Sequence, residues 1–218
     1  MRELNKLNVY KQAGKLFTKS LVKDYRGFEG RVVTRKGQQY REFDPSRSKL
    51  AAGIKKGLSQ CGIKKGDHVL YLGASHGYTP SFVSDIVGEN GFVYAVDFAP
   101  RVVRDLIFVC EERFNMAPLL RDANKPKTYE KDILRCDSLF MDVAQKNQVD
   151  IFLKNMKLVK KGGFGVLALK SRSVDIKKKP TTIFEETRKA LLKVHSVVDQ
   201  KNLYPWEKDH MLFIVKKK

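Results

Sequence analysis

The chain has 218 residues, and its 43 Lys and Arg against 24 Asp and Glu give a formal net charge of +19 at pH 7. This length can bury a large core without the help of disulfides or metal ions. Apolar residues make up 42% of the chain, which excludes a disordered protein. The charge favours a polyanionic partner, nucleic acid before an anionic membrane surface.

No apolar run approaches the roughly 20 residues that span a bilayer, and the first ten residues contain no apolar signal core. We therefore expect an intracellular protein that is neither secreted nor inserted in a membrane. The three cysteines, Cys61, Cys110 and Cys136, are scattered, which excludes a disulfide framework and a CxxC metal site. The four histidines are also dispersed, so we predict no metal site.

Residues 1–45 have the pattern of a small antiparallel β domain. Short strand-like segments alternate there with turns that contain Gly, Asp or Lys, at 16–22, 30–35 and 39–43. The sequence Asp44-Pro45-Ser46 then interrupts the pattern. Apolar residues at helical spacing follow, and they predict a helix that begins at Ser46 and opens a second domain over residues 46–218.

After residue 66, segments of strand length alternate with amphipathic helices. The predicted strands are 68–73, 91–98, 117–120, 138–143, 164–170, 195–203 and 210–216, and the predicted helices are 81–88, 101–115, 147–160 and 181–194. This alternation predicts a doubly wound α/β fold whose mostly parallel sheet is covered on both faces. The last two strands have no helix between them, so we expect them to pair antiparallel at one end of the sheet.

Ligands bind such sheets beyond the carboxyl ends of the strands. After the first strand come Gly73 and Gly77, whose loop could bring the backbone close to a ligand or could be a plain turn. After the second strand comes Asp97, which could accept hydrogen bonds from a ribose diol or could cap the next helix. Together the loop and the acid predict a cofactor that contains adenosine.

The loop lacks the second glycine of the GxGxxG dinucleotide fingerprint, because the residues after Gly73 read Ala-Ser-His-Gly. That glycine makes room for a pyrophosphate. S-adenosylmethionine has an adenosine but no phosphate, so it fits this loop better than a dinucleotide does.

The later strands also end in polar residues, namely Asp122, Asp142 and Lys170, and His210 opens the last strand. Each has an ordinary explanation as a solvated side chain, a helix cap or a structural histidine. Asp142 and Lys170, however, end neighbouring strands on the ligand side, and folding does not require an acid and a lysine there. Lys49 lies on the helix before the first strand and could join them.

Residues 46–218 resemble the fibrillarin family, in its compact archaeal form without a Gly/Arg-rich tail. The segments that carry the resemblance are SRSKLAAGI (46–54), YLGASHGYTPSFVSDIVGENGFVYAVDFAPRVVRDL (71–106), RDANKP (121–126), MDVAQ (141–145), LALKSRSVD (167–175) and YPWEKDH (204–210). The resemblance implies a Rossmann-like class I methyltransferase fold: a seven-stranded, mostly parallel sheet whose last strand is antiparallel. It also implies that the N-terminal β domain is the family's accessory domain.

The resemblance further implies an S-adenosylmethionine-dependent RNA 2′-O-methyltransferase in the cytoplasm. It would act in a box C/D ribonucleoprotein, where a guide RNA selects the nucleotide on pre-rRNA and also on tRNA. The implied protein partners are a Nop-family scaffold and a kink-turn-binding subunit similar to a ribosomal protein.

Site residues are carried over by motif. The implied cofactor positions are Gly73, Tyr78, Thr79, Asp97, Phe98, Asp122, Ala123, Asp142, Val143, Ala144 and Gln145. The family's active-site set of lysine, aspartate, lysine and histidine falls on Lys49, Asp142, Lys170 and His210. The chain departs from the family at His76, at Tyr78, at Asp97 and at Trp206, where small, Thr, Glu and Tyr residues are common.

Methyl transfer to a ribose hydroxyl requires that the hydroxyl lose its proton. We expect Lys170 to activate the hydroxyl, which it can do as a base if desolvation or a cation such as Lys49 displaces its own proton. Alternatively, charged lysines could stabilise the developing alkoxide. We expect Asp142 to hold Lys170 and His210 to place the ribose.

Three other functions compete with this reading. A Rossmann dehydrogenase would need the missing glycine and a site for hydride transfer. An RNA-binding assembly protein on an inactive methyltransferase fold would not need Lys49, Asp142, Lys170 and His210 together. A methyltransferase for small molecules or proteins would have the same fold but another substrate.

Overall fold

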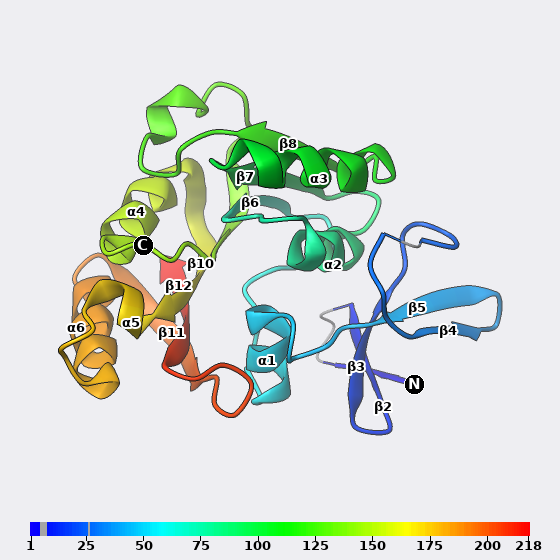
Figure 1. Cartoon of the computed structure of the whole chain (residues 1–218), viewed down its shortest axis with the longest axis horizontal. Coiled ribbons are helices and arrows are strands. Elements are labelled where there is room, and N and C mark those ends of the chain that lie inside the picture. Colours follow the sequence, from blue (N-terminus) through cyan, green and yellow to red (C-terminus); the bar gives the residue numbers. More distant parts are fainter. Residues whose placement is uncertain (5–7, 26) are drawn as a thin grey trace.

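The computed structural model describes residues 1–4, 8–25 and 27–218, which form two β-sheets and six α-helices (Figure 1). A five-stranded sheet comes first in the chain, and a seven-stranded sheet with all six helices around it follows. None of the described helices is both long and apolar enough to cross a membrane.

The first sheet is antiparallel throughout, with the strand order β1-β2-β3-β5-β4. Its strands are β1 (Arg2–Glu3), β2 (Val9–Gln12), β3 (Lys15–Lys19), β4 (Val32–Arg35) and β5 (Gln38–Glu42). The last three match the predicted segments, although β3 ends three residues early. Strands β1 and β2 were not predicted because they are short and mostly polar, so they show no alternation of apolar residues.

The second sheet has the order β11-β12-β10-β9-β6-β7-β8. Its strands are β6 (His68–Leu72), β7 (Phe92–Asp97), β8 (Met116–Leu120), β9 (Cys136–Met141), β10 (Val159–Lys170), β11 (His195–Asn202) and β12 (His210–Lys217). Strand β12 runs antiparallel to both β10 and β11, while β8, β7, β6, β9 and β10 pair parallel. The predicted α/β fold with an antiparallel pair at one end is confirmed.

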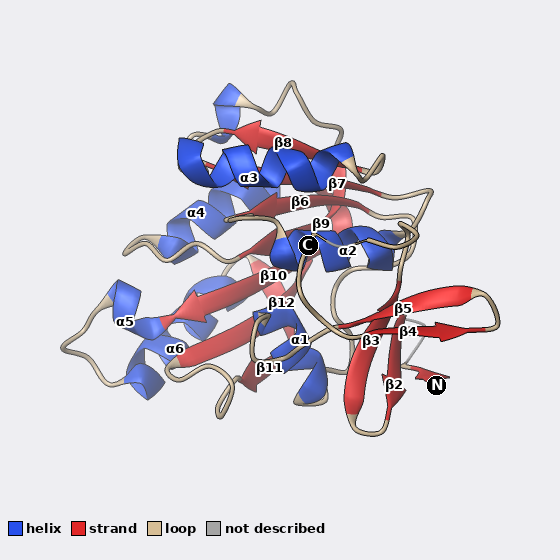
Figure 2. Ribbon diagram, turned by 45° about the vertical axis from the view of Figure 1, so that its right-hand side comes forward, coloured by secondary structure: helices blue, strands red, loops and turns tan. Residues whose placement is uncertain are grey.

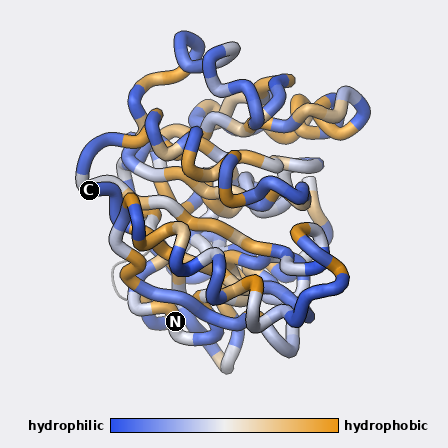
Figure 3. Tube along the Cα trace, turned by 90° about the vertical axis from the view of Figure 1, so that its left-hand side faces the viewer, coloured by the Kyte–Doolittle hydropathy of each residue, from blue (hydrophilic) through white to orange (hydrophobic). Residues whose placement is uncertain are grey.

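Helices cover both faces of this sheet (Figure 2). They are α1 (Lys49–Lys55), α2 (Tyr78–Val87), α3 (Pro100–Glu111), α4 (Gln148–Asn155), α5 (Ser171–Val174) and α6 (Pro180–Leu192). Alternate strand residues point to opposite faces, so Tyr71 packs in the core with α1, α2 and α3 while Leu70 and Leu72 pack in the core with α4 and α6. The apolar strands accordingly lie inside the molecule and hydrophilic loops surround them (Figure 3).

The helix predicted over 147–160 is too long. In the structure α4 ends at Asn155, a 3-10 turn covers Met156–Leu158, and β10 begins at Val159. Val159 pairs with Cys136 of β9, and the register then shifts before Phe164. Strand pairing across this bulge overrides the helical spacing of the apolar residues. Helix α5 and a 3-10 turn at Pro126–Thr128 were not predicted either.

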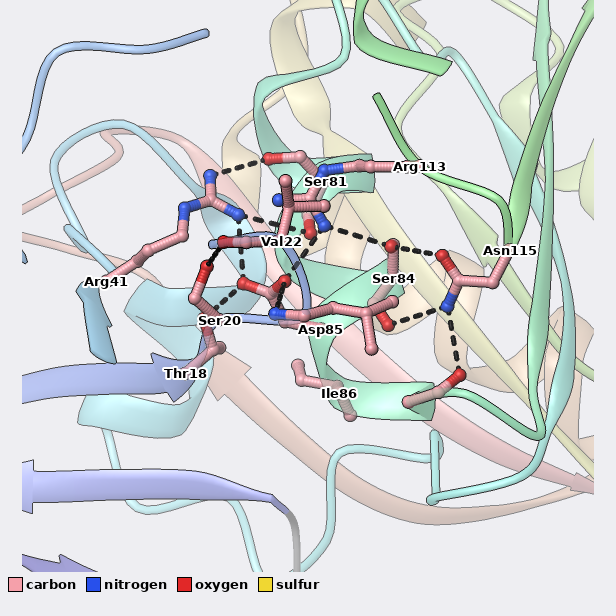
Figure 4. Close-up of polar contacts among 12 residues, drawn as sticks. Thr18, Ser20, Val22, Arg41, Ser81, Ser84, Asp85, Ile86, Arg113 and Asn115 are labelled. Carbon is pink, nitrogen blue, oxygen red and sulfur yellow. Dashed lines mark hydrogen bonds and ion pairs between the residues drawn. The ribbon is translucent and has the colours of Figure 1, made fainter. Parts of the chain in front are cut away.

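A buried aspartate joins the two sheets (Figure 4). The Asp85 carboxylate on α2 accepts hydrogen bonds from Thr18 of β3 at 2.7 Å, Arg41 of β5 at 2.9 Å and Arg113, just after α3, at 2.8 Å. Both guanidinium groups also lie over the ring of Tyr25, at 4.5 and 4.4 Å from its centroid. The N-terminal sheet therefore packs onto helix α2, which covers the larger sheet, through a buried charged contact.

Candidate active site

The candidate site is built on the loop between β6 and α2. Gly73 has a φ of +80°, and an added Cβ would lie 2.3 Å from the carbonyl oxygen of Asp142. This position therefore requires glycine for its conformation and for the close approach of two strand ends. The N–H of Ser75 donates to Asp97 Oδ2 at 2.9 Å, and the N–H of Ala99 donates to Asp97 Oδ1 at 3.1 Å. Asp97 thus organises the loop and the start of the next helix as well.

A pocket of about 290 Å³ opens beyond the carboxyl ends of β6, β7, β8 and β9. Its lining residues are Gly73, Ser75, Val96, Asp97, Phe98, Arg121, Asp122, Ala123, Asp142, Val143, Ala144 and Gln145. Every residue predicted to contact a cofactor is among them except Tyr78 and Thr79. The rule that parallel strands place their ligand site at the carboxyl edge accounts for Gly73, Asp97, Asp122 and Asp142, and the family resemblance supplied the other lining residues that were predicted.

Tyr78 and Thr79 lie at the start of α2 and face other neighbours. The Tyr78 ring packs edge-on against Phe28 and Phe82, and the guanidinium of Arg47 lies 4.1 Å from its centroid. Burial raises the pKa of this phenol. The Thr79 hydroxyl donates to Ser48 Oγ, the cap of α1, at 3.1 Å. Both side chains therefore make structural contacts. These contacts indicate that Tyr78, which stands where the family commonly has Thr, serves packing.

One rim of the pocket is a chain of amide and carboxylate groups that the sequence did not reveal in full. Asp122 Oδ1 accepts the backbone N–H and the side-chain amide of Asn124, at 2.9 and 3.0 Å, and these bonds lower the pKa of Asp122. The Asn124 amide also donates to Gln145 Oε1 at 2.9 Å and accepts from Asn147 at 2.8 Å. These hydrogen bonds thus hold the Asp122 carboxylate in place as a charged acceptor beside the pocket.

A second cluster lies next to this pocket and contains the predicted active-site residues. Lys49 Nζ is 2.8 Å from Asp142 Oδ2 and 3.9 Å from Glu207 Oε1. Glu207 Oε2 is in turn 3.5 Å from His210 Nδ1. Lys170 is the cross-strand partner of His210 in the pairing of β10 with β12. The structure therefore brings all four predicted residues to one edge and adds Glu207, which lies in the segment YPWEKDH (204–210) but was not predicted as a site residue.

The expected contact between Asp142 and Lys170 is corrected by the structure. The Asp142 carboxylate binds Lys49 instead, and no ion pair joins Asp142 to Lys170 within the described residues. Lys49 is the first residue of α1, which packs against β12. The side chain of Lys170 is exposed, so the chain alone does not desolvate its ammonium group.

His210 is buried at the start of β12. Its Nδ1 donates to the carbonyl of Lys208 at 2.7 Å, since a carbonyl oxygen can only accept. Burial, and then the charge of Lys49, lower the pKa of His210. At neutral pH the ring is therefore neutral, with Nε2 left as an acceptor for a hydroxyl group.

The sheet order, the antiparallel pair at one end and the pocket at the carboxyl edge define an α/β methyltransferase fold. A fibrillarin family model matches residues 2–218, which includes the N-terminal sheet that the sequence motifs did not cover. The fibrillarin-like rRNA/tRNA 2′-O-methyltransferase of Pyrococcus furiosus is 46% identical over 204 residues, 93% of this chain and 90% of that protein. The chain belongs to the fibrillarin family.

Solved structures agree with this assignment. The Methanococcus jannaschii fibrillarin pre-rRNA processing protein superposes with a TM-score of 0.94 at 41% identity, over 99% of this chain and 96% of that one. The Aeropyrum pernix fibrillarin with natively bound S-adenosyl-L-methionine gives 0.85 at 38% identity, over 92% and 88%. A chain of a fibrillarin/Nop5p complex gives 0.89 at 36% identity, over 97% and 98%.

Proposed function

We propose that this chain is the S-adenosylmethionine-dependent 2′-O-methyltransferase of a box C/D guide ribonucleoprotein and acts on rRNA and tRNA. One observation carries the proposal: a pocket with an acidic and aromatic lining adjoins the Lys49–Asp142 pair and the cross-strand pair of Lys170 and His210. The cofactor pocket and the reacting groups thus share one edge of the sheet.

The residues of the pocket fit the cofactor. Asp97 uses two of its acceptor sites on backbone N–H groups, which leaves sites for the two ribose hydroxyls. Phe98 is 64% exposed beside the pocket and offers a flat face to adenine. Asp122, held by Asn124, can accept from an exocyclic amine. Gly73 keeps the wall between Asp97 and Asp142 free of a side chain.

When bound, S-adenosylmethionine supplies an electrophilic methyl group. In our proposal His210 Nε2 accepts a hydrogen bond from the ribose and places the hydroxyl. Lys49 is held by Asp142 and puts a positive charge beside the pocket, which favours a developing alkoxide. Lys170 lies directly across from His210 and either takes the hydroxyl proton or stabilises the alkoxide by its charge. Guide–target duplex around the site desolvates Lys170, which the chain alone leaves exposed.

The activity is tested by methyl transfer to a guided RNA, with and without a Nop-family scaffold. We expect transfer to the 2′ oxygen at the guided nucleotide in the assembled particle. Transfer to a base or to protein, or no transfer in the full assembly, would contradict the proposal. The kink-turn-binding subunit completes that assembly, and the cytoplasm is the compartment we propose for it.

The role of Lys170 is tested by single-turnover methylation in the same particle. We expect Lys170→Ala to lower the rate by about 10²–10⁴-fold, the range typical of a lost acid–base group, with cofactor affinity nearly unchanged. Lys170→Arg separates the two roles, because arginine keeps its proton at neutral pH. A slow Lys170→Arg variant supports a base, and a rate near that of the wild type supports a purely electrostatic role.

The net charge of +19 favours binding to the negatively charged phosphates of RNA. We expect the isolated chain to bind RNA weakly, through phosphates and without sequence preference, with an affinity that falls steeply as salt rises. The guide, not this chain, then chooses the nucleotide. A lone chain that binds one RNA sequence selectively, at an affinity independent of salt, would contradict this division of work.

A further inference from the structure

Strand β10 continues beyond its parallel neighbour β9. The pairing with β9 ends at Leu167 and Met141, whereas β10 runs on to Lys170. On the other side of β10, Ser171 N–H donates to the carbonyl of Asp209 at 3.1 Å. Ladder bonds in an antiparallel pair alternate, so the backbone N–H and C=O of Lys170 point away from β12, toward the side where β9 has stopped.

The side chain of Gln148 occupies that side. Its Oε1 accepts from the N–H of Lys170 at 3.1 Å, and its Nε2 donates to the C=O of Lys170 at 3.1 Å. Gln148 is fully buried. One side-chain amide thus replaces the missing strand and satisfies both backbone groups of Lys170, which would otherwise lack partners at the end of the sheet.

Gln148 also connects the two strand ends that carry the reacting groups. It is the first residue of α4, three residues after the pocket segment that runs from Asp142 to Gln145. Lys170 and His210 form a pair without ladder bonds, the kind in which facing side chains lie closest. The backbone position of Lys170 therefore sets where its long side chain leaves the sheet, beside His210.

We propose that Gln148 is a positioning residue for Lys170: its amide fixes the backbone at the end of β10 and so aims the lysine at the ribose hydroxyl. The inference rests on the catalytic role proposed for Lys170. Gln148 itself touches the backbone of Lys170 and not the substrate. Gln148 is not among the site residues predicted from the sequence, because only the folded sheet shows that β9 ends before β10.

The test uses Gln148→Met in the assembled particle, since methionine has a similar length and neither hydrogen bond. We expect the single-turnover rate to fall about 10- to 100-fold, the scale of a misplacement near 1 Å. Because Gln148 positions Lys170 and does not itself bind a ligand, the KM for guided RNA and the calorimetric affinity for S-adenosylmethionine should change less than about threefold. If Gln148→Met folds poorly, Gln148→Asn takes its place. Asparagine is one methylene shorter, and we expect this variant also to lower the single-turnover rate.

A matched control separates positioning from stability. Asn115 is also a buried amide that donates to two backbone carbonyls, those of Ser84 and Gly88, but it lies away from the candidate site. We expect Asn115→Leu to lower the thermal midpoint and leave the single-turnover rate unchanged at a temperature where the protein is folded. A rate loss in Asn115→Leu equal to that in Gln148→Met would overturn the proposal.

A double variant decides whether Gln148 acts through Lys170. We expect Gln148→Met with Lys170→Ala to be as slow as Lys170→Ala alone, because no lysine remains to be aimed. Multiplied losses would show that Gln148 acts elsewhere. A normal rate in Gln148→Met beside a slow Lys170→Ala would overturn the positioning role alone, whereas a normal rate in Lys170→Ala would overturn the role of Lys170 as well.

Discussion

Asp97 holds two backbone segments together at the edge of the pocket. Its two oxygens accept from the N–H groups of Ser75 and Ala99, so it holds the glycine loop and the residue just before the next helix at once. It also lines the pocket. A single carboxylate therefore holds two backbone segments and, in our proposal, also contacts the ribose of the cofactor.

We predict that Asp97→Ala weakens binding of S-adenosylmethionine by about 1–3 kcal/mol, the usual cost of removing a charged hydrogen-bond acceptor. Isothermal calorimetry on the isolated chain measures this. Asp105→Ala is the control, because Asp105 is an exposed carboxylate on the next helix that pairs with His76 at 2.9 Å. Equal affinities of the two variants would remove Asp97 from the cofactor site.

Among the elements, the site depends on the close approach of the carboxyl ends of β6 and β9. Gly73 and Gly66 both have positive φ, at +80° and +85°. A Cβ on Gly73 would meet the carbonyl of Asp142, whereas a Cβ on Gly66 would meet no described atom within 4 Å. A side chain would therefore strain the backbone at both positions, and at Gly73 it would also clash with the pocket wall.

We predict that Gly66→Ala loses about 1 kcal/mol of unfolding free energy and keeps its cofactor affinity, because only the left-handed conformation is penalised. Gly73→Ala should lose more stability and bind S-adenosylmethionine at least about tenfold more weakly, since Asp142 must move. Urea unfolding and calorimetry measure the two effects. Identical behaviour of the variants would show that the close approach is unimportant.

The antiparallel strands β11 and β12 contain a second buried histidine. His195 faces Lys217 across the pair, and its pKa is lowered first by burial and then by Lys217 and Lys218. The unfolded chain, with an ordinary histidine pKa of 6.5, binds the proton more readily than the folded chain does. Stability is therefore full above about pH 6.5 and is lost as the pH falls toward the lowered folded pKa.

We predict that the free energy of unfolding decreases between pH 8 and pH 5 and that His195→Gln reduces this decrease. His210, whose pKa is lowered in the same direction, accounts for part of the remainder. Urea titrations of the wild type and of His195→Gln at both pH values make the comparison. A wild-type stability that rises on acidification would contradict the assignment of neutral histidines.

The sequence predicts those features whose signal lies in neighbouring residues, and it does not predict those that depend on contacts between distant segments. The strands 91–98, 138–143 and 164–170 are largely apolar, and Asp97, Asp142 and Lys170 lie at their carboxyl ends, so the fold and the edge that carries the site were both predictable. Side-chain direction was not. Tyr78 turns toward Phe28 and Asp142 pairs with Lys49 because of packing between segments far apart in the chain. The roles of Glu207 and Gln148 depend equally on tertiary contacts.

At the scale of the whole molecule, Asp85 determines how the two sheets hold together. Arg41 and Arg113 both bind its buried carboxylate, and Arg41 belongs to the N-terminal sheet. Burial lowers the pKa of Arg41, which shows how strongly the site disfavours an unpaired charge. Loss of the carboxylate would leave two guanidinium groups buried against each other, a far larger cost than the loss of an exposed ion pair.

We predict that Asp85→Ala lowers the free energy of unfolding by about 3–5 kcal/mol. Replacing all three charges, with Asp85→Leu, Arg41→Met and Arg113→Met, should recover much of the loss because no buried charge remains. Urea unfolding followed by circular dichroism and by the single tryptophan, Trp206, measures both variants. An Asp85→Ala variant as stable as the wild type would show that the contact is energetically neutral.

The same contact limits how this protein can be recombined with its relatives. Its four members, Thr18, Arg41, Asp85 and Arg113, come from segments on both sides of the predicted boundary after residue 45. A chimera that exchanges the first 45 residues would import new partners for Asp85 while keeping Arg113. The N-terminal sheet can therefore be exchanged as a module only between chains that share this charge pattern, so substitutions at these positions must be inherited as a set.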